Sequence, residues 1–107
     1  MQKLGSFVSI DNSVAIVDVE GKYDVGITAN VSDSLDQAYL QGCTSVLFEM
    51  ANTTYITSAT TRMFFKMGRK FGGNKNLQIV NAKGRVLAAL QEAAVDKYIM
   101  VNGGQLV

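Results

Sequence analysis

The chain has 107 residues, of which 48% are apolar and 18% charged, and its formal net charge at pH 7 is +1. This length and composition are typical of one folded globular domain, over residues 1–107, and exclude a disordered chain. No apolar stretch approaches the roughly 20 residues that span a bilayer, and the first residues lack the pattern of a signal peptide. The single cysteine, Cys43, has no internal disulfide partner, so we expect a buried structural thiol in a cytoplasmic protein without membrane association.

The sequence contains no histidine, which removes the commonest general base and metal ligand. One cysteine cannot build a zinc site, and no acidic cluster has the spacing of a calcium loop. Asp18, Glu20 and Asp24 are close in sequence, but exposure and strand alternation explain them. We therefore expect no catalytic residue, no metal, no cofactor and a function other than catalysis.

The first part of the chain predicts a β-hairpin, in which residues 7–10 and 14–19 are strands joined by Asp11-Asn12-Ser13. The second strand is apolar on both faces, which is typical of a strand inside a sheet. Residues 23–25 continue in an extended course. Apolar residues at helical spacing then predict a helix between Thr28 and Gly42, where the glycine ends it.

The rest of the chain alternates strands and helices. We expect strands over residues 45–48 and 77–80, and a short closing strand over 98–101. Helices are expected from Ser58 to about Lys70, with Met63, Phe64, Met67 and Phe71 on its apolar face, and over residues 84–94. The order β-β-α-β-α-β-α-β predicts an α/β fold with a mixed β-sheet covered by helices.

The start of the helix at Ser58 is the most informative position. A polar, uncharged segment delivers Thr57 and Ser58 to this helix start, where either hydroxyl can cap the first turn. Free backbone N–H groups and the helix dipole favour negative charge there. Two interpretations are open: Ser58 is a capping hydroxyl only, or it is a site that can carry a phosphate.

The charges are distributed unevenly along the chain. Residues 1–54 contain two basic and seven acidic side chains, whereas residues 55–107 contain eight basic and two acidic ones. Four of the bases lie between Arg62 and Lys70. Phe64 and Phe71 have core spacing and do not form a stacking platform, so we expect no direct contact with nucleic acid. The basic residues then form a solvated helix face or a surface for an acidic protein partner.

Three segments resemble the STAS domain of the bacterial anti-sigma factor antagonist family, over about residues 8–101. VLFEMANTTYITSATTRMFF (46–65) resembles the family's strand, variable loop and Ile-Asp-Ser-Ser-Gly-Leu-Gly segment, which opens a helix. LQIVNAKGRVLAALQEAAVDKYIMV (77–101) resembles its strand, Asn-containing turn and Arg-Val-led helix. Gly21-Lys22-Tyr23-Asp24 matches the Gly-x-x-Asp that follows its second strand.

This resemblance implies the STAS fold and a role in a partner-switching pathway of transcription regulation. The unmodified protein would bind an anti-sigma factor that is also a serine kinase, and so release the sigma factor. The kinase would phosphorylate Ser58, and a PP2C-type phosphatase would reverse the modification. The expected partner-binding residues are Asp24, Thr57, Ser58, Ala59, Thr60, Thr61 and Arg62.

The motif differs from the family pattern at several positions. Thr57 stands for Asp, Ala59 for the second Ser, and Thr60 and Arg62 for two glycines. We expect the bulkier Thr60 and Arg62 to hinder the close approach of a partner. Arg62 lies four residues after Ser58, and we hypothesise that it pairs with a phosphate on that serine. The alternative function is an unphosphorylated STAS scaffold or assembly module of a larger signalling complex, and a homo-oligomer is left open.

Overall fold

The computed structural model describes residues 1–103, and residues 104–107 of the predicted domain lie outside the described part. A six-stranded sheet has the order β1-β2-β3-β5-β7-β8. Its strands are β1 (Gln2–Lys3), β2 (Val8–Asp11), β3 (Val14–Asp18), β5 (Ser45–Glu49), β7 (Leu77–Val80) and β8 (Met100–Val101). β1, β2 and β3 pair antiparallel, whereas β3, β5, β7 and β8 are parallel. The predicted mixed sheet of an α/β fold is therefore confirmed.

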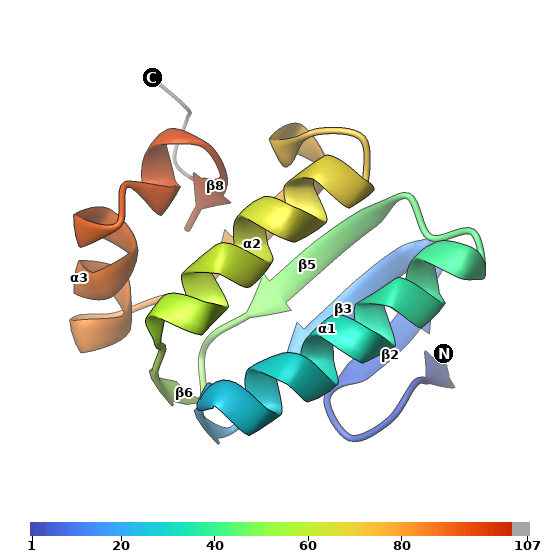
Figure 1. Cartoon of the computed structure of the whole chain (residues 1–107), viewed down its shortest axis with the longest axis horizontal. Coiled ribbons are helices and arrows are strands. Elements are labelled where there is room, and N and C mark those ends of the chain that lie inside the picture. Colours follow the sequence, from blue (N-terminus) through green and yellow to red (C-terminus); the bar gives the residue numbers. More distant parts are fainter. Residues whose placement is uncertain (104–107) are drawn as a thin grey trace.

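Three helices lie on one side of this sheet (Figure 1). They are α1 (Val25–Leu40), α2 (Ser58–Lys70) and α3 (Gly84–Glu92), and two short 3₁₀ turns cover Asn74–Asn76 and Val95–Lys97. α1 and α2 lie side by side, and α3 lies beyond α2, near β8. Strand residues that face the helices, such as Val17 and Phe48, are fully buried, whereas their neighbours Ile16 and Leu47 are half-buried. The helices thus cover one face of the sheet.

The core joins the sheet to the apolar face of α2. Phe48 of β5 and Phe64 of α2 pack edge to face, with ring centroids 4.9 Å apart. The four residues predicted for the apolar face of this helix, Met63, Phe64, Met67 and Phe71, are all buried, which confirms that prediction. Cys43 is also buried, and burial raises the pKa of its thiol, in agreement with a structural role.

The hairpin prediction is confirmed, and its turn explains why. Asn12 and Ser13 both have positive φ, 49° and 68°, as a two-residue turn between right-twisted strands requires. β3 lies between β2 and β5, so the prediction of an interior strand is also confirmed.

Several predicted boundaries were wrong. α1 begins at Val25, not Thr28, because the Asp24 carboxylate accepts a hydrogen bond from the Ile27 N–H at 2.8 Å and caps the helix. The extended course predicted for residues 23–25 therefore stops at the cap. α1 ends at Leu40, and Gly42 follows at φ +98°, the left-handed geometry that made glycine a stop signal.

The chain after α3 and around β6 also differs from the prediction. α3 ends at Glu92, not residue 94, and Ala94 takes a left-handed φ of 58°. The closing strand has only the two residues of β8. Three short strands were not predicted. β1 pairs with β2 at the edge of the main sheet, whereas β4 (Gly21–Lys22) and β6 (Thr53–Tyr55) pair in parallel as a second sheet. This small sheet holds the chain just before α1 and α2 begin.

Candidate functional site

The start of α2 is fixed by the residues that precede it. Ile56 is buried, and Thr57 is the extended N-cap residue, with φ −116° and ψ 174°. Ser58 is the first helical residue, and its side chain is exposed. The structure thus places the Ser58 hydroxyl at the helix N-terminus, as the sequence predicts, with Thr57 as the capping residue.

Thr60 lies at the centre of a buried group of hydroxyls under this helix start. Its Oγ1 accepts a hydrogen bond from the Thr57 N–H at 3.1 Å and lies 3.2 Å from Thr57 Oγ1. The same oxygen lies 3.1 Å from Thr28 Oγ1 of α1 and 3.4 Å from the Tyr23 carbonyl oxygen. Thr28 is 5% exposed and Thr60 is fully buried. These contacts fasten the first turn of α2 to α1 and to the segment after β4.

The burial of Thr60 corrects one prediction. We expected Thr60 to hinder a partner because it is bulkier than glycine, but its side chain points into the protein and presents nothing to solvent. Arg62 is exposed and does add bulk to the surface. Thr60 therefore contributes to a partner surface only by holding the neighbouring residues in place.

The other expected partner-binding residues lie in three hollows around the helix start. Asp24 and Thr57 line one, together with Lys22 and Arg85. Ser58, Thr61 and Arg62 line the second, between α2 and α3, where Glu92 lies on the facing helix. Ala59 and Arg62 line the third, between α1 and α2. Thr57 and Arg62 each line two of these hollows, so these six residues form one continuous surface around the N-terminal start of α2.

Sequence reasoning missed several residues of this surface and of the contacts beneath it. Lys22, Tyr55 and Arg85 line the hollow beside Thr57. Lys22 lies inside the Gly-x-x-Asp segment and Arg85 inside the Arg-Val-led helix, but only topology brings them together. Thr28 had a signal in the sequence, because it stands on the same helical stripe as Val31 and is the only hydroxyl there.

The electrostatics around the helix start favour an anion. Lys22, Arg62 and Arg85 contribute three positive charges to the hollows next to Thr57 and Ser58, against the carboxylates of Asp24 and Glu92. The first turn of α2 contains no acidic residue. The positive end of the helix dipole is thus not neutralised from within the helix.

Tyr23 lies directly beneath the site. Its side chain is fully buried, and its hydroxyl has no hydrogen-bond partner among the described residues. Burial raises the pKa of this phenol well above its ordinary value, and the nearby negative charge of Asp18 adds to the effect. Tyr23 is therefore a neutral core residue whose backbone carbonyl, not its hydroxyl, serves the site.

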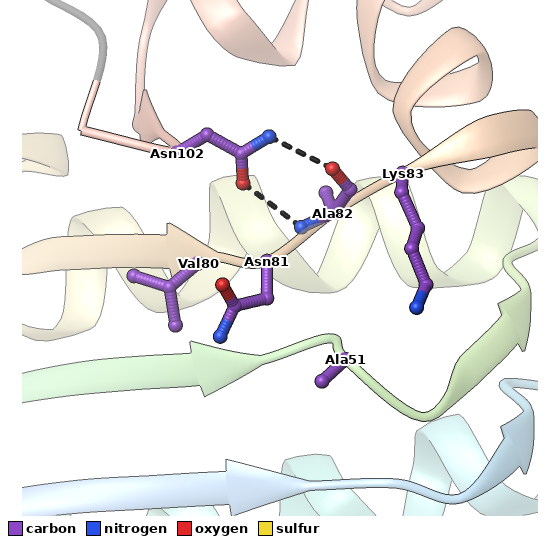
Figure 2. A pocket seen from close by; sticks show the side chains of 6 residues that line it. All are labelled: Ala51, Val80, Asn81, Ala82, Lys83 and Asn102. Carbon is purple, nitrogen blue, oxygen red and sulfur yellow. Dashed lines mark hydrogen bonds between the residues drawn. The ribbon is translucent and has the colours of Figure 1, made fainter.

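A fourth hollow lies at the carboxyl ends of β5 and β7, the edge where open α/β sheets commonly bind ligands (Figure 2). The Asn102 amide there makes two hydrogen bonds of 2.8 Å with the backbone of Ala82, one to its N–H and one to its carbonyl. Asn81 donates to the Glu49 carboxylate at 2.9 and 3.0 Å. These polar groups satisfy one another, and they tie the end of β8 to the turn before α3.

Two further features of residues 1–103 bear on the class of site. No group of three or more His, Cys, Asp or Glu side chains in this range is placed to hold a metal ion. None of the helices in the same range has the length and apolar character needed to cross a membrane. The arrangement at α2 offers an exposed hydroxyl, a helix dipole and nearby cations, which together suit the binding of an anionic group.

No protein-family model matches the sequence, and no curated protein matches it significantly in sequence. Solved structures do match. The anti-sigma factor antagonist SpoIIAA, in its unphosphorylated form, superposes with a TM-score of 0.65 at 13% identity, over 84% of this chain and 94% of that one. A candidate anti-sigma factor antagonist from Thermotoga maritima superposes with a TM-score of 0.76 at 12% identity, over 88% of this chain and 82% of that one. The chain therefore has the STAS-domain fold of the anti-sigma factor antagonists.

Proposed function

We propose that this chain is a single-domain cytoplasmic regulator that acts as an anti-sigma factor antagonist in a partner-switching pathway. It binds an anti-sigma factor that is also a serine kinase, and phosphorylation at Ser58 controls the binding. The observation that carries the proposal is the exposed Ser58 hydroxyl at the first position of α2, on a fold shared with SpoIIAA. The SpoIIAA structure is that of its unphosphorylated form, which supports a phosphorylated counterpart in that protein.

The surroundings of Ser58 support a switch at this position. A phosphate there adds nearly two negative charges beside the positive end of the helix dipole. Arg62 lies one turn further along the same helix and lines the same hollow as Ser58. A partner that docks on this hollow in the unmodified state meets a different charge and shape after modification. A PP2C-type phosphatase would restore the binding surface.

Intact-mass spectrometry of the protein isolated from its natural host tests the modification. We expect a species with one phosphate, which Ser58→Ala abolishes and Thr44→Ala retains. Thr44 is the control because it is an exposed hydroxyl residue that lies outside the three hollows around the start of α2. A chain without phosphate under all growth conditions, or a phosphate that remains in Ser58→Ala, would show that Ser58 is not the switch.

Two variants of Ser58, similar in size but different in charge, test binding to the kinase. Ser58→Asp is expected to weaken the complex by about tenfold or more, because it introduces negative charge at the docked surface. Ser58→Asn has nearly the same shape without the charge, and should bind nearly as well as the wild type. Equal affinities of the Asp variant and the wild type contradict the proposal.

A second candidate function is an unphosphorylated assembly module, and the uncovered face of the sheet favours it. Val14, Ile16, Leu47 and Val80 are only half-buried on that face. Ile16 and Leu47 are neighbours across β3 and β5, and accessible apolar surface is common where proteins associate. Sedimentation of the purified chain as an oligomer, together with an unmodified Ser58 in the host, would favour this function over the first.

A further inference from the structure

A groove of about 410 Å³ lies between residues of α1 and α2. In Figure 1, α1 lies on the side of α2 that faces away from α3. α1 contributes Val25 and Ser32 to the groove, and α2 contributes Ala59. The groove adjoins the hollow of the proposed phosphorylation site at Arg62, but Ser58 does not line it.

The groove carries positive charge without compensation. Arg62, Lys66 and Arg69 follow one another at helical spacing along its edge, all three are exposed, and none of the residues that line the groove is acidic. Lys66 Nζ donates to Ser32 Oγ at 3.3 Å, so its ammonium group is held across the groove. Among residues 1–103 the only ion pair joins Lys70 and Asp36, which lie outside the lining, at 3.1 Å.

The groove also offers apolar surface. Val25 is the first residue of α1, and its side chain is 69% exposed. Ala29 of α1 is exposed and Ala59 of α2 is half-buried, and both line the groove beside Val25. An occupant of this groove therefore needs both an apolar side and a negative side.

We propose that the groove binds an acidic amphipathic helix of a partner protein. Two adjacent helices form rows of side chains between which a third helix can pack. Its apolar face would lie on Val25, Ala29 and Ala59, and its carboxylates would pair with Arg62, Lys66 and Arg69. Nucleic acid fits less well, because no aromatic side chain lines the groove for base stacking. This inference goes beyond the proposed switch and does not depend on phosphorylation of Ser58.

A designed peptide of about 15 residues tests the groove, with leucines on one helical face and glutamates beside them. Binding of the labelled peptide is measured by fluorescence anisotropy. Arg62→Glu/Lys66→Glu should weaken it by about tenfold or more, because two attractive contacts become repulsive. Arg62→Gln/Lys66→Gln should weaken it less, and Val25→Ser should weaken it severalfold. Amide chemical shifts should change along α1 and the first turns of α2.

The matched control makes the same change in net charge as Arg62→Glu/Lys66→Glu, but at positions outside the groove. Lys75→Glu/Lys97→Glu alters two exposed cations of the 3₁₀ turns and should keep the affinity within about twofold. Equal binding of a scrambled peptide, or no effect of Val25→Ser, would reduce the interaction to general charge attraction and overturn the proposal. Displacement of the peptide by oligothymidylate would point to nucleic acid instead. Failure of the peptide to bind also overturns it, whatever the state of Ser58.

Discussion

The hydroxyl oxygens of Thr28 and Thr60 lie 3.1 Å apart, and both side chains are buried where α1 lies beside the start of α2. A hydrogen bond between two buried side chains fixes the helices in one relative position, because each hydroxyl loses its partner if the helices slide. Thr60 is also bonded to the Thr57 N–H. The geometry of the exposed Ser58 thus depends on a contact beneath the surface.

The Thr28–Thr60 contact predicts a non-additive pair of substitutions. Thr60→Val leaves the Thr57 N–H and the Thr28 hydroxyl without this partner, and should cost about 1–3 kcal/mol of unfolding free energy. Thr28→Val alone should cost about 1 kcal/mol. The double variant should cost less than the sum, since it no longer contains the Thr28 hydroxyl that Thr60→Val leaves unpaired. Urea unfolding of all four proteins measures the coupling, and strict additivity would show that the two hydroxyls do not interact.

Tyr23→Phe should leave stability at pH 7 unchanged or slightly increased. The Tyr23 hydroxyl is buried without a partner among the described residues, so its removal relieves a desolvation cost. The exposed Tyr98 gives the matched control, and Tyr98→Phe should be neutral. A loss of more than about 1 kcal/mol in the Tyr23 variant would mean that the hydroxyl has a partner.

Tyr23 also predicts the pH dependence of stability. Burial raises the pKa of Tyr23 in the folded state, so above the ordinary tyrosine value of about 10 the unfolded chain releases a proton that the folded chain retains. Stability is therefore fully present below about pH 10 and falls as the pH rises beyond it. Unfolding free energies measured between neutral and strongly alkaline pH should fall less steeply in Tyr23→Phe. The raised pKa of Cys43 lowers stability with rising pH in the same direction, but Cys43 is present in both the wild type and Tyr23→Phe, so it does not affect the comparison. Parallel curves would contradict the assignment.

Asn102→Ala should destabilise the fold by about 1–3 kcal/mol, because the N–H and the carbonyl of the buried Ala82 both lose a partner. Asn30 is exposed on α1 and serves as the control, where alanine should be neutral or slightly stabilising. The loss should appear in hydrogen exchange as faster exchange of the Ala82 amide. Unchanged exchange there would show that the two bonds in Figure 2 are not maintained in solution.

The main elements of the fold follow from sequence patterns that are local. The Thr57-Ser58 hydroxyls predicted the start of α2, Gly72-Gly73 predicted its end, and the turn Asp11-Asn12-Ser13 predicted the β2–β3 hairpin. The first turn of α1 was missed because its cap, Asp24, precedes any apolar repeat. β4 and β6 were missed because strands of two and three residues carry no periodic signal and exist only through their pairing.

The same distinction holds at the candidate site. Ser58 at a helix start was predictable, since a hydroxyl before an apolar helical pattern has a local meaning. Thr60 was misinterpreted because the direction of its side chain depends on α1, more than thirty residues earlier in the chain. Lys22 and Arg85 belong to the surface only because β4 and α3 flank the N-terminal start of α2. Residues that only the topology brings together can be identified from the structure but not from the sequence.

Arg62 and Ser58 lead to a prediction on stability that is independent of any partner. Ser58→Asp should raise the unfolding free energy by about 0.3–1 kcal/mol, because a negative charge at the first position of α2 meets the helix dipole, which no acidic residue of that turn compensates. Phosphorylation of Ser58 should raise it further, and part of that gain should come from pairing with Arg62.

Thermal unfolding of the phosphorylated and unmodified forms separates the two contributions. Arg62→Ala should reduce the increase in Tm that phosphorylation causes, whereas Arg69→Ala should leave the increase intact, because Arg69 lies on the same helix but does not line the hollow of Ser58. The contribution of Arg62 should also shrink at high salt, as expected for charges at an exposed helix end. If phosphorylation raises Tm equally in the wild type and in Arg62→Ala, then the helix dipole acts alone and Arg62 does not hold the phosphate.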